Sequence, residues 1–91
     1  MTEQAFQKKV IKWFKDKNQY VLNQHGHGWG AKGAPDLIVC YNGKFLAFEL
    51  KVGNNTMQPD QIIHKRRIER ANGLHFAPHS YEEFLEIMEE I

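Results

Sequence analysis

The dipeptide Asn42-Gly43 joins two short runs of β-prone residues, and it constrains the fold of this chain more than any other feature. Asn-Gly is the preferred pair for a two-residue type I′ hairpin turn, because both positions need a positive φ. A two-residue turn also fixes the register, so that Tyr41 pairs with Lys44 and each step away from the turn pairs the next two residues. The sequence therefore predicts an antiparallel hairpin over residues 36–52.

This register sorts the hairpin side chains onto two faces, because neighbouring residues of a strand point in opposite directions. One face is expected to carry six apolar residues: Leu37, Val39, Leu46, Phe48, Leu50 and Val52. The other face is expected to carry Ile38, Cys40, Phe45 and Ala47, followed by Asp36, Glu49 and Lys51. Both faces are mostly apolar near the turn. We therefore expect an internal hairpin that is covered on both sides.

The rest of the sequence alternates between helical and extended patterns. Periodic apolar residues predict helices over 2–17, 59–71 and from residue 81 onward, and β-prone runs predict short strands over 20–22 and 74–77. Thr2 and Ser80 are the expected N-caps of the first and last helices. The predicted order is αβββαβα, which makes an α/β fold in which helices flank a mixed sheet with a central Asn-Gly hairpin.

Composition limits the architecture and is nearly silent about the partner. The 91 residues, with 42% hydrophobic side chains, fit one domain over residues 1–91. Twelve basic residues against eleven acidic ones give no basic signature of a nucleic-acid binder. The sequence shows no secretory signal and no apolar run long enough to span a bilayer, so we expect no membrane partner. The single cysteine, Cys40, fits a reducing compartment, and a cytoplasmic location is expected.

Two acidic residues face each other at the open end of the predicted hairpin. The register places Asp36 opposite Glu49, and like charges at such positions need solvent, a proton or a cation. A hard divalent cation such as Mg²⁺ would relieve the conflict, because it prefers oxygen ligands. Lys51 follows on the same face. An activated water beside an ammonium group is suited to phosphodiester hydrolysis.

At these residues the sequence resembles a known family. The segments Gly33-Ala34-Pro35-Asp36 and Glu49-Leu50-Lys51 resemble the signature of the PD-(D/E)XK nuclease superfamily. The form Gly-x-Pro-Asp-Leu, with Gln61 after Gln58-Pro59, is similar to the VRR-NUC group and especially to its small stand-alone phage and bacterial members. The resemblance extends from Glu3 through the last strand to residues 80–83, and so covers nearly the whole chain.

The resemblance implies a restriction-endonuclease-like core and a role for each matched residue. Asp36, Glu49 and the backbone carbonyl of Leu50 would bind Mg²⁺ or Mn²⁺, and Lys51 would orient or activate the attacking water. Glu3 and Gln61 match residues that support the site. The resemblance further implies a homodimer that cuts branched DNA, such as Holliday junctions, inside a bacterial host cell.

Basic residues in two segments are candidates for contact with DNA. The glycine-rich stretch 25–33 contains His27 and Lys32, and the second predicted helix contains four clustered cations: Lys65, Arg66, Arg67 and Arg70. An ordinary loop and a solvated helix face are the alternatives for these two segments. Zinc binding is disfavoured, because no Cys or His pair has structural-zinc spacing.

Other interpretations stay open for the site and for the whole chain. Glu3 also suits the first turn of a helix as a favourable charge, and Gln61 suits the first turn as an ordinary polar residue. The chain could be a non-catalytic DNA-binding module with a nuclease fold, or a nuclease that cuts flaps or a specific duplex. The near-neutral total charge is expected to conceal a polarised surface, because five acids lie on the last predicted helix: Glu82, Glu83, Glu86, Glu89 and Glu90.

Overall fold

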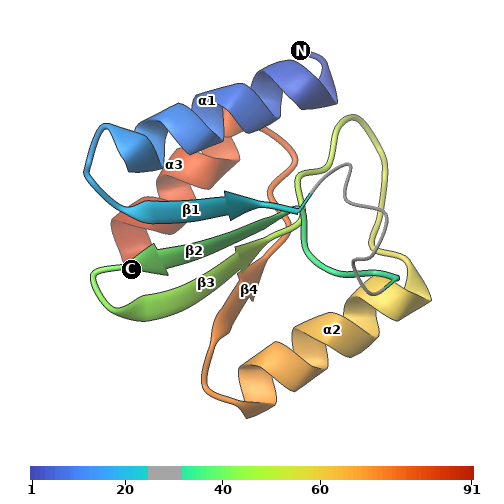
Figure 1. Ribbon diagram of the computed structural model, residues 1–91. Coiled ribbons are helices and arrows are strands. Elements are labelled where there is room, and N and C mark those ends of the chain that lie inside the picture. Colours follow the sequence, from blue (N-terminus) through green and yellow to red (C-terminus); the bar gives the residue numbers. More distant parts are fainter. Residues whose placement is uncertain (25–31) are drawn as a thin grey trace.

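The computed structural model describes residues 1–24 and 32–91 and shows three helices and four strands among them. In chain order these are α1 (Glu3–Lys15), β1 (Tyr20–Asn23), β2 (Leu37–Tyr41), β3 (Lys44–Phe48), α2 (Pro59–Arg70), β4 (Leu74–Phe76) and α3 (Tyr81–Glu90) (Figure 1). The predicted order αβββαβα is confirmed. The element boundaries differ from the predicted ones by at most two residues, except that the hairpin predicted to extend to residue 52 ends at Phe48.

The four strands form one mixed sheet in the order β1-β2-β3-β4. β2 pairs antiparallel with both β1 and β3, whereas β3 and β4 are parallel. The pairing of Tyr41 with Lys44 and the register that follows from it are confirmed up to the pair Leu37 and Phe48. Asn42 and Gly43 have φ values of 50° and 82°, as the predicted type I′ turn requires.

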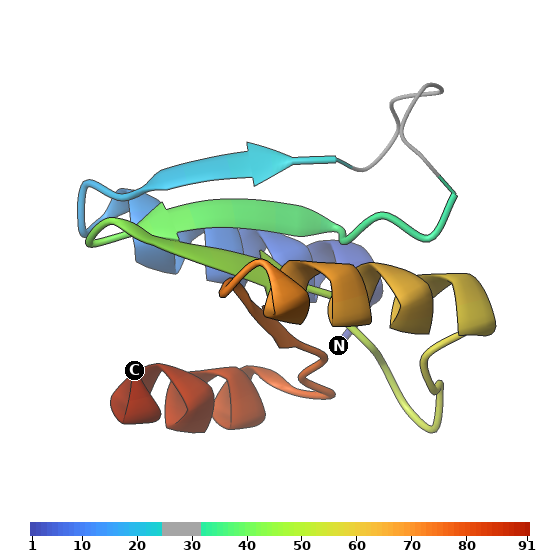
Figure 2. The same cartoon turned by 90° about the horizontal axis from the view of Figure 1, so that it is seen from below.

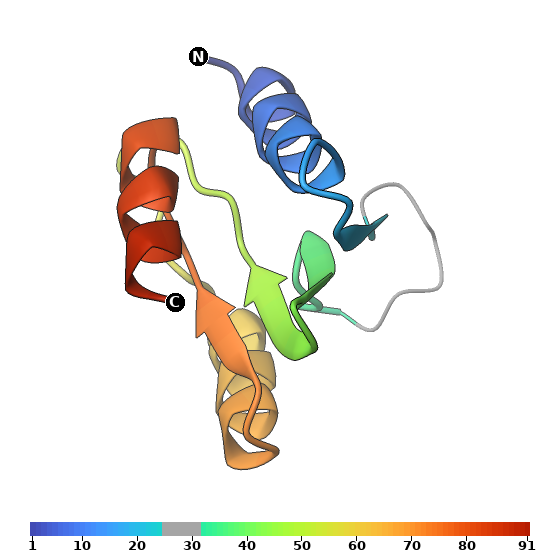
Figure 3. The same cartoon turned by 90° about the vertical axis from the view of Figure 1, so that its left-hand side faces the viewer.

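The helices lie on both faces of the sheet. α1 and α3 cover one face, and α2 covers the other face at the β4 side (Figures 2 and 3). The core lies between the sheet and the pair α1/α3. At its centre the rings of Phe14, Phe48 and Phe84 are in mutual contact, with centroids 5.5 to 5.7 Å apart. The buried cluster also contains Phe6, Val10, Leu37, Val39, Leu46, Leu50 and Met88.

The face of the sheet that carries α2 is only partly covered. Phe45 is 46% exposed, Tyr20 is 65% exposed, and Cys40 is also exposed. The expectation of a hairpin covered on both sides is therefore wrong near the turn. The physical reason is that α2 belongs to the crossover between the parallel strands β3 and β4, so it packs on β4 and leaves the outer face of β1 and β2 open to solvent.

Both predicted helix N-caps are present. Thr2 Oγ1 accepts a hydrogen bond from Ala5 N, and Ser80 Oγ accepts one from Glu83 N. α3 carries its five acidic residues exposed on the opposite side of the sheet from α2. Within residues 1–24 and 32–91, every helix is too short or too polar to cross a bilayer.

Candidate active site

The residues that were predicted from the sequence to be catalytic or metal-binding line one cavity of about 290 Å³. The cavity lies where β2 begins, where β3 ends and where α2 begins. Its lining includes all six candidate catalytic and metal-binding residues: Glu3, Asp36, Glu49, Leu50, Lys51 and Gln61. These residues are up to 58 positions apart in the chain, so the fold brings them together. Their catalytic and metal-binding roles remain predictions.

Asp36 connects the two strands at the open end of the hairpin. Its Oδ2 accepts a hydrogen bond of 2.9 Å from Leu50 N, and its backbone carbonyl accepts one of 2.8 Å from Gln24 N. Asp36 is therefore held by its side chain to the segment that follows β3 and by its backbone to the segment that follows β1. This fixes the carboxylate of Asp36 at the cavity wall beside Glu49.

Glu49 is a buried acid, with only 1% of its surface exposed. Its Oε2 accepts a 3.3 Å hydrogen bond from Gln61 Nε2, whereas its Oε1 has no hydrogen-bond partner among the described residues. Burial and the negative charge of Asp36 raise the pKa of Glu49 from 4.5 to about 8, although Lys51 acts in the opposite direction. Without a cation, Glu49 is thus mostly protonated at neutral pH.

Lys51 is 8% exposed, and its ammonium group is held inside the cavity. Lys51 Nζ donates a hydrogen bond of 2.8 Å to Gln61 Oε1. Its backbone is held by a bond from Lys51 N to Pro78 O, and two residues earlier Glu49 N donates to Phe76 O. The parallel strand β4 and the two residues after it therefore fix the direction of residues 49–51.

The side-chain amide of Gln61 links the carboxyl group of Glu49 to the ammonium group of Lys51. Its oxygen accepts from Lys51 Nζ and from Gln58 N, and its nitrogen donates to Glu49 Oε2. Because both oxygen contacts are donors and the nitrogen contact is an acceptor, the network defines the amide orientation. The bond from Gln58 N is the capping-box contact of a first-turn residue of α2, and the bonds to Lys51 and Glu49 show that the same side chain also contacts both charged groups of the cavity.

Gly33 sets the position of α2 against the segment that precedes β2. It has φ +83°, and a Cβ atom at this position would lie 2.7 Å from the backbone carbon of Asp60. Only glycine allows this close approach without strain. The contact places the first turn of α2, and with it Gln61, next to the segment that delivers Asp36.

Several features of this region were not found from the sequence. Asn55, Thr56 and Gln58 also line the cavity, but a polar loop without periodicity gives no signal for such a role. His75 on β4 is 4% exposed, and neither ring nitrogen has a hydrogen-bond partner among the described residues. Burial and the nearby Lys65 lower the pKa of His75 to about 4, so the ring is neutral at physiological pH.

The candidate DNA-binding residues do not line this cavity. Arg66, Arg67 and Arg70 are exposed on α2, and Lys65 forms a 2.9 Å ion pair with Glu69. Lys32 is exposed, and its backbone carbonyl lies 3.0 Å from His64 Nε2. His27 lies outside the described residues. The cations of α2 are therefore placed beside the cavity along the helix and not inside it.

The cavity offers oxygen ligands of the kind that a hard cation prefers, but only a few of its side chains can serve as metal ligands. Among residues 1–24 and 32–91 no group of three or more His, Cys, Asp or Glu side chains is placed to hold a metal ion. Mg²⁺ commonly takes one or two carboxylates and keeps several waters. Asp36 and the unpartnered Glu49 Oε1 meet that requirement, and a cation would also favour the ionised form of Glu49. The residues present therefore fit such an ion.

Comparison with known proteins gives one result that bears on this geometry. No protein-family model matches the chain, and no curated protein matches it. A solved structure described as "VRR_NUC domain" is similar to it, with a TM-score of 0.78 and 25% sequence identity. The match covers 96% of this chain and 94% of that one. The two chains thus share their architecture over nearly their full lengths.

Proposed function

Because the chain belongs to the VRR-NUC family by its fold and its motif, we propose that it is a metal-dependent endonuclease that hydrolyses phosphodiester bonds in DNA. The observation that carries the proposal is the cavity in which Asp36, Glu49 and Lys51 meet around the amide of Gln61. Two carboxylates and an ammonium group beside an open, polar cavity are suited to a phosphate diester and a water molecule.

Each residue has a proposed task that follows from its chemistry. Asp36, Glu49 and the carbonyl of Leu50 would hold Mg²⁺ or Mn²⁺. When bound, such an ion supplies Lewis-acid stabilisation of phosphate charge and lowers the pKa of a coordinated water. Lys51 Nζ, oriented by Gln61 Oε1, would position the attacking water and stabilise the negative charge that develops on the phosphate. Glu3 would add negative charge at the mouth of the cavity.

In the proposed reaction, water attacks the phosphorus in line with the leaving group. A new P–O bond forms to the water oxygen while the bond to the 3′-oxygen breaks. The water gives up a proton and the leaving oxygen takes one up, so charge is conserved. The resemblance to the family implies products with a 5′-phosphate.

We further propose that the substrate is branched DNA and that the working form is a homodimer. A chain of this size offers little surface for reading a duplex sequence, so recognition of DNA shape by two copies suits it better. The exposed cations of α2, Arg66, Arg67 and Arg70, would contact phosphates. A mass measurement in solution should give about twice the 10.7 kDa of one chain.

The decisive experiment compares cleavage of labelled four-way, flapped and linear DNA in Mn²⁺ and in EDTA. Asp36→Ala and Lys51→Ala should each abolish cleavage, while Lys8→Ala on the far side of α1 should cleave like the wild type. Thermal melting of each variant shows whether the fold is retained. Full residual cleavage by both cavity variants would overturn the assignment, and binding of DNA without any cleavage would favour a non-catalytic module.

A further inference from the structure

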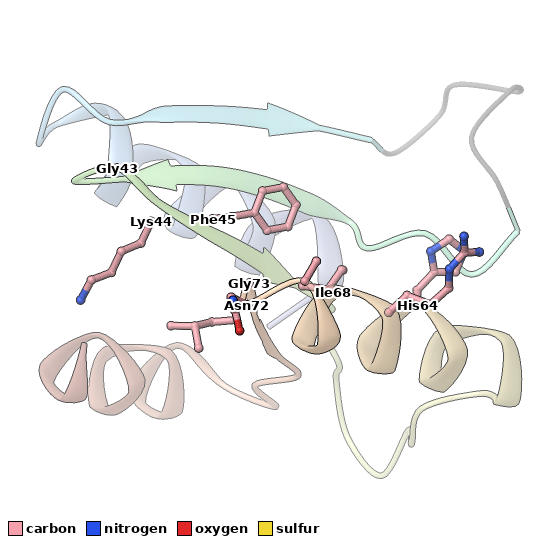
Figure 4. Close-up of a pocket in the computed structure, with 10 residues that line it drawn as sticks. Gly43, Lys44, Phe45, His64, Ile68, Asn72 and Gly73 are labelled. Carbon is pink, nitrogen blue, oxygen red and sulfur yellow. The ribbon is translucent and has the colours of Figure 1, made fainter.

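A second hollow, which we call the α2 groove, lies on the partly covered face of the sheet. It has a volume of about 960 Å³ and lies between the β2–β3 turn, β3 and the C-terminal half of α2 (Figure 4). Phe45 lines it from β3, and Ile68 lines it from α2. The lining also includes Lys44, His64, Arg67 and Leu74. None of these residues belongs to the cavity described above.

The α2 groove continues into a row of exposed aromatic side chains. Cys40 is the register partner of both Phe45 and Tyr20, so these three residues form one row across β3, β2 and β1. Phe45 is 46% exposed, Tyr20 is 65% exposed, and Cys40 is exposed. The two exposed rings lie on the same face of the sheet, on either side of Cys40 of β2, and each offers a surface on which planar groups can stack.

The charges around the α2 groove select the kind of occupant. Its lining contains the cations Lys44 and Arg67 together with His64, and it contains no acidic residue. An occupant that offers both planar rings and negative charge matches this combination, and unpaired nucleotides offer both. A second copy of the chain matches poorly, because a two-fold contact places the same surface on both sides, and this lining has no acidic residue to pair with Lys44 and Arg67 of the other copy.

The α2 groove and the catalytic cavity lie along the same helix. Gln61 in the cavity and Ile68 in the groove are seven residues apart, which is about 10 Å along a helix axis. This equals about three nucleotides at the axial rise of a stacked strand. We propose that the α2 groove binds the unpaired bases of a DNA strand that continues into the cavity. The connection to the cavity rests on the proposed function, and it makes branched DNA with a short unpaired segment the preferred substrate.

The test measures binding of a fluorescent oligothymidine by anisotropy in EDTA, so that no cleavage occurs. Phe45→Leu keeps an apolar side chain but removes the ring, and it should weaken binding about 5- to 150-fold, which is the range for one lost base–aromatic stack. Phe45→Trp should retain wild-type affinity. Arg67→Ala should reduce the slope of log affinity against log salt by about 0.7, whereas the control Lys8→Ala on the opposite side of the sheet should reduce it far less.

A measurement on the wild-type protein guards against a variant that fails to fold. In a ¹⁵N correlation spectrum the oligothymidine should shift the amide signals of Phe45, Ile68 and Gly73 before those of α3. Shifts confined to other surfaces would overturn the proposal. Unchanged affinity of a folded Phe45→Leu variant for the oligothymidine would also overturn it. A third contrary result would be a wild-type protein that does not bind the oligothymidine but forms a dimer that Phe45→Leu dissociates.

These outcomes separate the groove from the nuclease assignment. If cleavage depends on Asp36 and Lys51 but oligothymidine binding does not depend on Phe45, only the groove proposal is refuted. If oligothymidine binding depends on Phe45 but no DNA is cleaved, the nuclease assignment is refuted and the groove is still a single-strand binding surface.

Discussion

Lys51 Nζ lies 2.8 Å from Gln61 Oε1, and this hydrogen bond joins the end of β3 to the first turn of α2. The same amide of Gln61 donates to Glu49 Oε2. A neutral side chain with a donor at one end and an acceptor at the other thus sets the spacing between the acid and the ammonium group of the cavity.

The first prediction concerns the donor of Gln61. Gln61→Glu keeps an acceptor for Lys51 but cannot donate to Glu49, and it adds a third negative charge beside Asp36 and Glu49. We expect cleavage to fall about 10- to 100-fold, as for other residues that orient a ligand without contacting the substrate. Initial rates at saturating Mn²⁺ measure this.

The matched control for that change is Gln19→Glu at the turn end of the sheet. Gln19 Nε2 donates to Lys17 O and to Asn42 Oδ1, so the substitution likewise removes an amide donor, but at the other end of β2. Its cleavage rate should equal that of the wild type. Equal loss in both variants would show that Gln61 acts only through general stability.

The second prediction concerns Glu49 and pH. Because its pKa is about 8 in the folded chain and about 4.5 in the unfolded chain, its contribution to stability is complete below pH 4.5 and is lost as pH rises through 8. In EDTA the free energy of unfolding should fall by about 2 kcal/mol between pH 6.5 and 8, at about 1.4 kcal/mol per pH unit. Urea unfolding at the two pH values measures the fall.

Glu49→Gln should remove that fall, because its amide does not titrate. Glu89→Gln, on exposed α3, is the matched control and should keep the fall. Mg²⁺ should raise the stability of the wild type more at pH 8 than at pH 6.5. A wild-type stability that stays level from pH 6.5 to 8 in EDTA would contradict the buried, protonated state of Glu49.

The third prediction concerns the buried ring of His75. Its pKa is about 4 in the folded chain and 6.5 in the unfolded chain, so its contribution to stability is present above pH 6.5 and is lost as pH falls toward 4. The loss is about 3 kcal/mol. The free energy of unfolding of His75→Leu, taken relative to that of the wild type, should therefore rise by about this amount as the pH falls from 7 to 4.

The difference between wild type and His75→Leu isolates this group, because Glu49 titrates in both proteins. At pH 7 the variant should be at least as stable as the wild type, since it removes two buried nitrogens that have no partner among the described residues. His79→Leu, which replaces an exposed histidine, is the control. A pH-independent difference between wild type and His75→Leu would refute the prediction.

The fourth prediction separates two costs at glycine positions. Gly33 and Gly53 both have positive φ, but a Cβ at Gly33 would meet the backbone of Asp60, whereas a Cβ at Gly53 would meet no atom within 4 Å. Gly53→Ala should cost about 1 kcal/mol from φ alone, and Gly33→Ala should cost more. Gly33→Ala should also lower cleavage, because it displaces the start of α2. Equal losses of stability would contradict the close approach.

The hairpin and the acidic pair at its open end could be predicted because local rules determine them, whereas Glu3 and Gln61 were assigned to the site only by the resemblance. The Asn42-Gly43 turn fixes the register, and the alternation of a strand then places Asp36 and Glu49 at adjacent strand ends. The motif residues line one cavity because β2, β3 and the start of α2 meet there. These relations depend on neighbours in the sequence and on one helix start at Pro59.

The remaining features depend on contacts between distant segments. The burial of His75 results from the parallel pairing of β4 with β3 and from the packing of α2, which no local pattern encodes. The same pairing leaves Phe45 and Cys40 uncovered, although their alternation resembles that of a buried strand. The cavity residues Asn55 and Thr56 lie in a loop whose sequence has no periodicity, so only the fold could reveal them.

The backbone bonds from Glu49 N to Phe76 O and from Lys51 N to Pro78 O have a consequence for protein synthesis. Residues 49–51 are synthesised before their partners at 76–78, so the bonds to β4 and the residues after it cannot form until that segment has been made. During that interval the acid and the ammonium group have no parallel strand to hold them, and His75 is not yet in place beside β3. The cavity is therefore completed only after β4 has been made, and a nascent chain without β4 lacks the bonds that hold residues 49–51 in place.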